Sequence, residues 1–199
     1  NYIYIGGPFT LVNNVARSYA AAIGISGTGT LSNWMPQYNN TVNSIFPFEN
    51  KLWVSGSFTL GHVFKCTNLF SYQKSNGAIR TAFAPAINSS VFASVVSGAN
   101  LYIGGQFTVV AGLTRNRCAA LSTTNGALKS FLPDLNSYVY SLALNGTTLY
   151  VGGIFTTANG QTRNRLCAYN TANSSLKTFN PNLNNAAYAL HISDSLLYA

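Results

Sequence analysis

The decapeptide LYIGGQFTVV (residues 101–110) recurs with few changes as LYVGGIFTTA (residues 149–158). Two further copies share its core: IGGPFT ends at Thr10 and VSGSFT ends at Thr59. The phenylalanines of the four copies follow one another at intervals of 49, 49 and 48 residues, at Phe9, Phe58, Phe107 and Phe155. Such self-similarity at a fixed period indicates that the chain is built from stacked structural repeats.

Two other markers have the same period and divide the chain. Prolines recur at intervals of 49, 48 and 48 residues, at Pro36, Pro85, Pro133 and Pro181. The tetrapeptide TRNR occurs at 114–117 and again at 162–165. These markers define a partial first repeat (1–36), a second repeat (37–85), a third repeat (86–133), a fourth repeat (134–181) and the start of a fifth (182–199).

Within each repeat the local signals are those of short β-strands. In the fourth repeat, YVYSLALN alternates in polarity and is rich in strand-forming residues. LYVGGIFT, RLCAYNT and LKTFNP are predicted as three further strands, separated by GTT, by the loop ANGQTRN and by ANSS. Four short antiparallel strands in 48 or 49 residues are typical of one blade of a β-propeller, so we expect an all-β propeller without helices.

The paired glycines of the motif have a structural interpretation. Glycine weakens the middle of a strand and is found there where another backbone or a ligand comes close. We expect the pairs to let neighbouring blades approach near the propeller axis, with the phenylalanine two residues later filling the space between the sheets. The glycines concerned are Gly6, Gly7, Gly56, Gly104, Gly105, Gly152 and Gly153. A phosphate-binding loop is disfavoured, because neither Lys-Ser/Thr nor a helix start follows.

The ends of the chain leave two arrangements open. Residues 2–5 resemble a second strand without a first, whereas residues 185–193 resemble a first strand, followed by LLYA at 196–199. In a closed ring of four blades, residues 185–193 would supply the missing strand. LLYA would then duplicate the strand at 2–5, so we expect instead a segment of a larger propeller.

The succession of LY(I/V)GGxFT, TRNRxAA and NGxLxxFxP resembles a known family, the bacterial β-propeller repeats called delta-60 repeats. The double glycine is also similar to that of kelch blades. Delta-60 repeats are common in large secreted and surface proteins, notably Bacteroidetes proteins with type IX secretion signals. The resemblance covers the whole chain, is best at 99–181 and is weaker at 11–35 and 60–75. It implies a secreted multi-blade scaffold used for protein binding, adhesion or assembly, and it brings no catalytic residues.

Composition narrows the possible partners. Of the 199 residues, 47% are hydrophobic and only 7% are charged, against roughly 25% charged in an average soluble domain. A surface made soluble by Asn, Ser, Thr and Gly suits a secreted protein. The net charge is +8, but the basic residues are spread along the chain, which disfavours nucleic-acid binding. No apolar run reaches the roughly 18 residues that a membrane helix needs, so we expect no membrane insertion.

Carboxylates for catalysis are sparse. Only three acids occur, and Glu49 and Asp194 fall at the same hairpin turn as Gly98 and Gly146 in other repeats. That position indicates turn residues, and Asp134 is expected in a turn as well. A glycosidase needs two carboxylates flanking one bond, and no such pair is apparent.

Histidine and cysteine show no catalytic or metal-binding pattern. His62 and His191 have no partners at metal-ligand spacing. Three cysteines cannot all pair within the chain. Cys118 and Cys167 differ by one residue in their distance from the motif, so we expect them on opposite strand faces, unpaired and, like Cys66, buried as small hydrophobes. We therefore expect no enzyme activity, no metal site and no cofactor.

Recurrent arginines and tyrosines near the rims are the candidates for ligand binding. Four guanidinium groups on one rim would suit phosphates or acidic sugars; alternatively, each arginine caps loop carbonyls or stacks on a ring within its own blade. Tyrosines expected to be exposed near the rims would stack on sugars or pack between blades. The residues are Arg115, Arg117, Arg163, Arg165, Tyr38 and Tyr138. Trp34 and Trp53 follow the repeat and are expected to be structural.

Glycosylation sequons of the form N-x-S/T occur at Asn39, Asn88, Asn145 and Asn173 and matter only in a eukaryotic secretory protein. The sequence as a whole predicts a non-enzymatic extracellular β-propeller scaffold, which serves as a binding or spacer module of a larger secreted or cell-surface protein. Its expected partners are other proteins, surface glycans and the remaining blades of a longer chain. Two alternatives stay open: a glycan-binding, lectin-like propeller, and part of a propeller hydrolase whose catalytic residues lie outside this segment.

Overall fold

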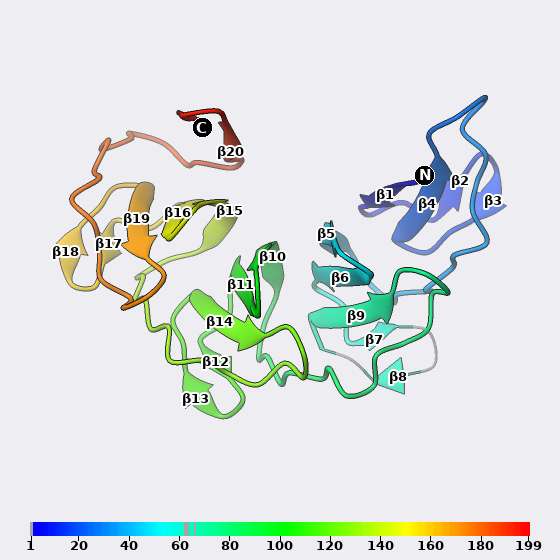
Figure 1. Cartoon of the computed structure of the whole chain (residues 1–199), viewed down its shortest axis with the longest axis horizontal. Coiled ribbons are helices and arrows are strands. Elements are labelled where there is room, and N and C mark those ends of the chain that lie inside the picture. Colours follow the sequence, from blue (N-terminus) through cyan, green and yellow to red (C-terminus); the bar gives the residue numbers. More distant parts are fainter. Residues whose placement is uncertain (1, 62–63, 66) are drawn as a thin grey trace.

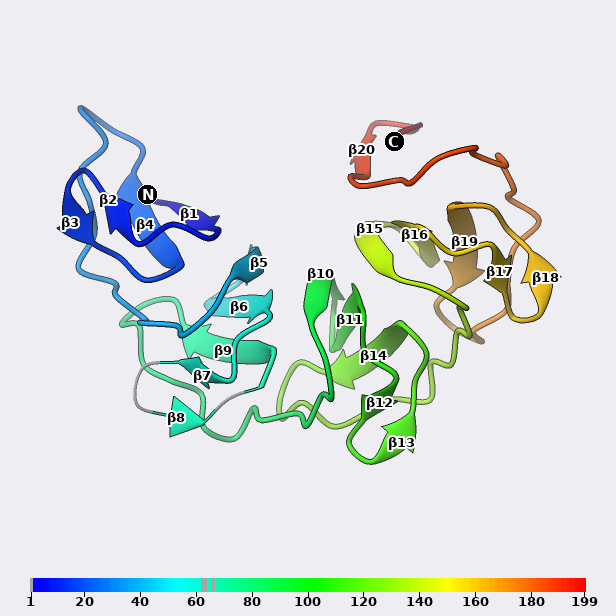
Figure 2. The same cartoon turned by 180° about the vertical axis from the view of Figure 1, so that it is seen from behind.

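The computed structural model describes residues 2–61, 64, 65 and 67–199. Over these residues the chain is all-β: its strands form nine small antiparallel sheets, and no helix occurs. The sheets follow one another along an open arc, with the two termini at opposite ends of the arc (Figures 1 and 2). No helix long and apolar enough to span a membrane is found in this part of the chain.

Each of the second, third and fourth repeats forms one three-stranded sheet in meander order. The strands are β5 (Val42–Phe48), β6 (Lys51–Gly56) and β9 (Leu69–Gln73); β10 (Val91–Ser97), β11 (Asn100–Gly105) and β14 (Cys118–Ser122); and β15 (Val139–Asn145), β16 (Thr148–Gly153) and β19 (Leu166–Asn170). The first repeat contributes β1 (Tyr2–Gly6) and β4 (Ala20–Gly24), which pair. The first strands β5, β10 and β15 line the concave side of the arc (Figure 1), so consecutive repeats contact one another there.

A two-stranded hairpin lies on the convex side of each repeat, where the sequence predicted only a loop. The hairpins pair β2 (Leu11–Val12) with β3 (Val15–Ala16), β7 (Leu60–Gly61) with β8 (Phe64–Lys65), β12 (Val109–Val110) with β13 (Leu113–Thr114), and β17 (Thr157–Ala158) with β18 (Gln161–Thr162). The predicted Asn-Gly turn is confirmed: Asn159 and Gly160 both have positive φ, as a tight hairpin turn requires.

The predicted fourth strand is reduced to one bridge per repeat, such as Leu121 with Leu128 and Tyr169 with Leu176. The strand ends early because an aromatic side chain three residues after Leu128, Phe131, turns inward and is buried between two sheets. Pro133 follows and has no N–H to donate to a sheet edge. Phe83 is likewise buried before Pro85, whereas Phe179 before Pro181 is exposed.

The C-terminal segment also differs from the sequence-based prediction. Strand β20 (His191–Ser193) pairs with β21 (Leu196–Tyr198), and residues 185–190 form no strand. Strand β1 pairs with β4 alone among the described strands, so residues 185–193 do not close a ring onto it. By contrast, the shared hairpin turn is confirmed: Glu49, Gly98, Gly146 and Asp194 all have φ between 51° and 56°.

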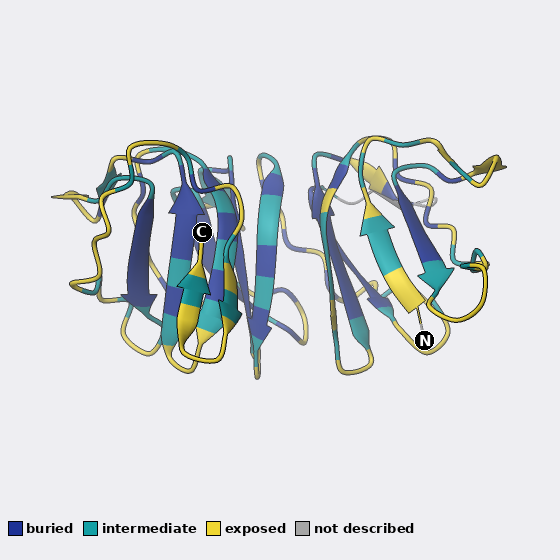
Figure 3. Ribbon diagram, turned by 90° about the horizontal axis from the view of Figure 1, so that it is seen from above, coloured by how far each residue is buried: buried dark blue, intermediate teal, exposed yellow. Residues whose placement is uncertain are grey.

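The hydrophobic core consists of clusters that each span two repeats. Figure 3 shows buried residues running along the strands, whereas the turns are exposed. The motif phenylalanines Phe58, Phe107 and Phe155 are fully buried, and each belongs to a cluster with residues from the preceding repeat. The prediction that they fill the space between sheets is therefore confirmed for these three.

A second set of aromatic rings also recurs between the repeats. Phe131 packs edge-on between Tyr102 and Tyr169, with ring centroids 5.3 and 6.0 Å apart. Trp34 makes the same contacts with Tyr4 and Tyr72, at 5.5 and 5.8 Å. Perpendicular aromatic pairs at these distances are favourable beyond the area that they bury. The aromatic residue two positions before the repeat proline therefore joins the second strand of one repeat to the third strand of the next. This contact confirms a structural role for Trp34.

The first glycine of each pair lies against the next repeat, as predicted. A Cβ atom at Gly104 would overlap the Val139 side chain, and one at Gly152 would lie 3.0 Å from the Cβ of Ala187. At Gly6 it would lie 2.5 Å from Val42 Cγ1. At these three positions a side chain would displace the neighbouring segment, whereas the second repeat holds the fully buried Ser55 at the equivalent position.

The second glycine has a different partner, within its own repeat. A Cβ at Gly105 would overlap the carbonyl oxygen of Ser90, just before β10, and one at Gly153 would overlap that of Tyr138, before β15. The Ser90 carbonyl also accepts a hydrogen bond from the N–H of Gln106 at 2.9 Å. The second glycine therefore lets the first and second strands of one sheet cross closely. The prediction that it lets neighbouring repeats approach is wrong for this position.

In the second, third and fourth repeats, the threonine after the motif phenylalanine is held by an asparagine 20 residues earlier. Asn88 donates from Nδ2 to Thr108 Oγ1 at 3.0 Å, and its Oδ1 accepts the N–H groups of Thr108 and Val109. The pairs Asn39–Thr59 and Asn136–Thr156 repeat these bonds. The sequon amides of Asn39 and Asn88 are thus engaged within the fold.

Replacing Gly105 or Gly153 with valine is expected to lower the free energy of unfolding by at least about 2 kcal/mol, because a branched side chain would push the first strand out of register. Urea denaturation measures the change. Gly7→Val is the matched control, since the nearest atom there is a side-chain carbon of Phe9 at 3.3 Å and no backbone carbonyl. A loss below about 0.5 kcal/mol for Gly105→Val would contradict the close approach.

Candidate functional site

The first arginine of each TRNR motif holds two segments of its own repeat together. Arg115 donates from Nη1 to the Thr114 carbonyl at 2.7 Å and from Nη2 to the Lys129 carbonyl at 3.4 Å. Arg163 makes the equivalent bonds to the carbonyls of Thr162 and Lys177. Each guanidinium therefore ties the convex hairpin to the segment after the third strand.

The second arginine of the motif occupies a left-handed backbone position. Arg117 and Arg165 have φ of 69° and 68°. The carbonyl of Arg165 accepts the N–H of Gly153 at 2.9 Å, and its guanidinium donates to the Ile154 carbonyl at 2.6 Å. The Arg117 guanidinium donates to the Gln106 carbonyl in the same way. The second arginine of each motif therefore accepts the N–H of the second motif glycine with its own carbonyl.

The same left-handed position is filled by other residues in the first two repeats. Tyr19 and Asn68 have φ of 68° and 64°. Their backbone N–H groups donate to the carbonyl of the motif phenylalanine, as those of Arg117 and Arg165 do. The backbone geometry therefore does not depend on the positive charge. All four TRNR arginines are half-buried and donate to backbone carbonyls, which agrees with the capping interpretation. Binding of an anion by these residues stays a prediction.

The two candidate tyrosines lie in different surroundings. Tyr138 is half-buried, and its ring faces the Arg117 guanidinium of the preceding repeat at 5.2 Å. Tyr38 was expected to be exposed, and this is wrong: it is 3% exposed, with its ring 4.4 Å from that of Phe58 and its hydroxyl 3.0 Å from that of Tyr72. The backbone of Tyr38 also forms a β-bridge with Gly61 of the convex hairpin.

The His, Cys, Asp and Glu side chains of the described residues form no cluster that could hold a metal ion. No group of three or more His, Cys, Asp or Glu side chains occurs in the part of the chain that the structure describes. Asp134 accepts a hydrogen bond from Asn116, the asparagine of TRNR, at 2.7 Å. His191 is exposed beside Tyr198. His62 and Cys66 lie outside the described residues.

The buried cysteines correct one sequence-based expectation. Cys118 and Cys167 are both free and fully buried, but they belong to one hydrophobic cluster. Cys118 lies in the sheet of the third repeat and Cys167 in that of the fourth. One face of the third sheet packs against the opposite face of the fourth, so two cysteines on opposite strand faces meet at one interface. Burial raises the pKa of both thiols, that of Cys167 to about 12. Neither is a nucleophile near neutral pH, because the thiolate is the reactive form.

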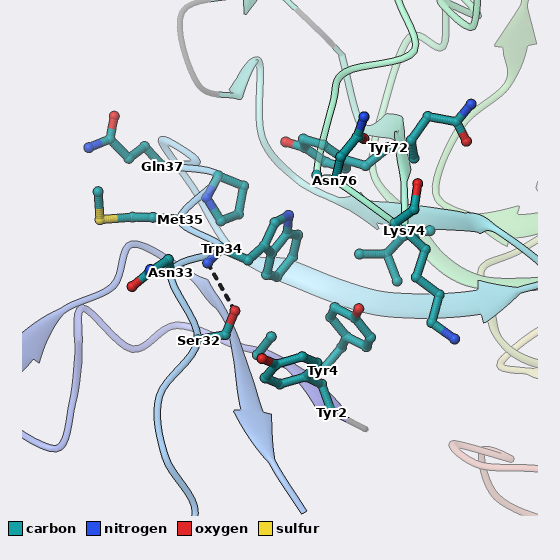
Figure 4. A pocket seen from close by; sticks show the side chains of 16 residues that line it. Tyr2, Tyr4, Ser32, Asn33, Trp34, Met35, Gln37, Tyr72, Lys74 and Asn76 are labelled. Carbon is teal, nitrogen blue, oxygen red and sulfur yellow. Dashed lines mark hydrogen bonds between the residues drawn. The ribbon is translucent and has the colours of Figure 1, made fainter.

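A cleft of about 590 Å³ lies between the first and second repeats. Figure 4 shows Trp34 between Tyr4 of the first repeat and Tyr72 of the second. The Trp34 backbone N–H donates to Ser32 Oγ at 3.0 Å (Figure 4), which holds the segment before Pro36. The remaining side chains are mostly polar. The cleft is lined by Tyr2, Tyr4, Ala22, residues 32–37, Leu52 and residues 72–77.

One substitution between repeats explains why the cleft is open here. At the next interface, Arg80 spans the equivalent groove and donates from Nη2 to the carbonyls of Thr123 and Thr124 at 3.1 and 2.9 Å. Ser32 occupies the place of Arg80, since their backbone N–H groups donate to equivalent residues of the third strands. A serine is too short to cross the groove, so the space between residues 32–37 and 72–77 stays open.

The cleft has a mixed chemical character. Four side-chain amides line it, those of Asn33, Gln37, Gln73 and Asn76. Lys74 is the single charged side chain in its lining, and no carboxylate is part of it. Sequence reasoning missed the cleft because its two walls are some 40 residues apart and become neighbours only when the repeats stack.

Arg165→Ala is expected to lower the free energy of unfolding by about 1.5–3 kcal/mol, because it removes the charge-assisted bonds to the carbonyls of Ile154 and Phe155. Arg165→Asn is expected to lose less, since Asn68 occupies this position in the second repeat. Lys129→Ala serves as control, because its exposed side chain makes no hydrogen bond in the described structure. Thermal and urea unfolding measure the effects, and equal stability of Arg165→Ala and Lys129→Ala would refute the capping role.

Comparisons with known proteins support the architecture and leave the function open. A family model described as a β-propeller domain of unknown function, DUF5122, matches residues 148–176. The crystal structure of the computationally designed Ika4 protein superposes with a TM-score of 0.53 at 11% identity, over 81% of this chain and 85% of that one. The designed Ika8 protein gives a TM-score of 0.38 at 10% identity, over 89% and 76%. No curated protein matches. Residues 148–176 are thus similar to a β-propeller repeat family.

Proposed function

We propose that the chain is a non-enzymatic binding module within a larger secreted or cell-surface β-propeller of the delta-60 type. The observation that supports this most is how the polar side chains of the repeats are used. The TRNR arginines and the motif asparagines bind backbone groups of their own repeats, which makes the sheets a rigid support. Rigid supports present their loops and the grooves between their elements to partners.

The distribution of carboxylates favours binding over catalysis. Glu49 lies in the turn between β5 and β6, 3.8 Å from Lys51, and Asp194 lies in the turn between β20 and β21. Asp134 is engaged by Asn116 in the third interface. Hydrolysis of a glycosidic bond uses two carboxyl groups within about 10 Å across the bond. Because the three acids belong to three separate repeats and none lines the cleft, a binding role fits these residues better.

Composition supports a location outside the cell. Charged residues are 7% of the chain, and the exposed turns are rich in Asn, Ser, Thr and Gly. The resemblance to delta-60 repeats points the same way. Partners in this setting are surface proteins and glycans, which would meet the loops and the groove between the first and second repeats.

Protease treatment of intact source cells tests the proposed location. Trypsin added outside the cells is expected to release peptides of this chain, detected by mass spectrometry, or the chain is expected in the culture medium. A cytosolic protein followed in the same samples controls for lysis. Recovery of the chain only after the cells are broken, together with the cytosolic control, would overturn the proposed extracellular function.

A further inference from the structure

We propose that the cleft between the first and second repeats binds a short saccharide and prefers one that carries a carboxylate, which Lys74 recognises. This inference rests on the proposed binding function and names the ligand class of one site. The TRNR arginines are not part of this site, since none of them lines the cleft.

The size of the cleft suits a small ligand. Its volume of about 590 Å³ lies within the roughly 300–1,000 Å³ of typical small-molecule sites. Such sites combine an apolar, aromatic surface with a few polar groups that orient the ligand. Sugar rings have the matching character, because C–H groups cover their faces and hydroxyl groups surround their edges.

The aromatic wall of the cleft is held in place before any ligand binds. Trp34 is half-buried and makes perpendicular contacts with Tyr4 and Tyr72, at interplanar angles of 87° and 85°. Its backbone is fixed by Ser32. Tyr2 adds a ring that is 54% exposed at the edge of the cleft. A rigid aromatic anchor loses little conformational entropy when a ligand stacks on it.

The polar wall offers hydrogen bonds of the kind that sugar hydroxyls make. Each amide of Asn33, Gln37, Gln73 and Asn76 carries donors and an acceptor. Asn76 Oδ1 accepts the N–H of Ala78 at 3.0 Å, which orients that amide in the turn. Side-chain amides bind hydroxyl groups as both donor and acceptor, whereas a phosphate or sulfate site would need several cations or backbone N–H groups.

The charge of the cleft favours an acidic sugar over a neutral one. Lys74 is the one charged residue in the lining, so a carboxylate there would meet a cation and no competing anion. The net charge of the chain is +8, which attracts an acidic glycan at longer range.

Indole NMR signals give a direct test, because the chain has two tryptophans in different places. Trp53 is fully buried, whereas Trp34 bounds the cleft. The chain labelled with ¹⁵N is titrated with trigalacturonate and with maltotriose, a neutral trisaccharide. We expect trigalacturonate to shift the Trp34 indole signal and leave that of Trp53 unchanged, with maltotriose bound about tenfold more weakly. Spectra of Trp34→Phe assign the two signals.

Three variants locate the site. Trp34→Phe is expected to keep the fold, since Phe83 and Phe131 hold the same place in other repeats, and to weaken binding about tenfold. Ser32→Arg is expected to abolish binding by closing the cleft as Arg80 does at the next interface. Lys74→Gln is expected to remove the preference for the acidic sugar, and Lys129→Gln, on another repeat, is the matched control.

The outcomes separate this inference from the proposed function. If neither trisaccharide moves the Trp34 signal, and a glycan array of neutral, uronic-acid and sialylated glycans retains no chain, the saccharide site is refuted while an extracellular location still stands. Binding that survives both Trp34→Phe and Ser32→Arg would refute the cleft as its location. An unchanged preference in Lys74→Gln would refute the role of the carboxylate.

Discussion

The structure depends on one close approach, in which a carbonyl before the first strand passes over the second glycine of the next strand. Gly105 has no side chain to block the Ser90 carbonyl, and Gln106 donates its N–H to that same oxygen. On its other side Gly105 donates to the carbonyl of Arg117, which is held in a left-handed conformation. The motif thus joins all three strands of a sheet at one point, and the sheets stack from there.

The repeat sequence predicted the periodic part of this arrangement. The strands of the sheets, their turns and the buried motif phenylalanines follow from local patterns, so residues such as Glu49 and Asp194 were placed correctly in turns. Contacts between segments distant in sequence were not predictable in this way. The prediction of a fourth strand was wrong because Phe131 packs between two sheets. The prediction that Cys118 and Cys167 lie apart was wrong because the faces of neighbouring sheets meet.

The candidate site depends on where the repeats differ rather than on what they share. The TRNR arginines were conspicuous in the sequence because they recur, and recurrence reflects a packing task that each repeat must solve. The cleft arises where Ser32 replaces a longer residue and where Trp34 replaces a phenylalanine. Neither change stands out in the amino-acid sequence. A polar cleft with an aromatic wall becomes visible only when residues 32–37 face residues 72–77 (Figure 4).

Native-state amide hydrogen exchange of Ser57, Gln106 and Ile154 tests the close approach most directly. Each of these N–H groups donates to the carbonyl that passes over the preceding glycine, at 2.9–3.0 Å. Although the three residues follow the end of a strand, we predict that they exchange as slowly as core amides such as that of Ile103, only on unfolding of the sheet. Exchange as fast as that of the exposed turn amides would show that the carbonyl does not hold the first strand in place, and would contradict the account.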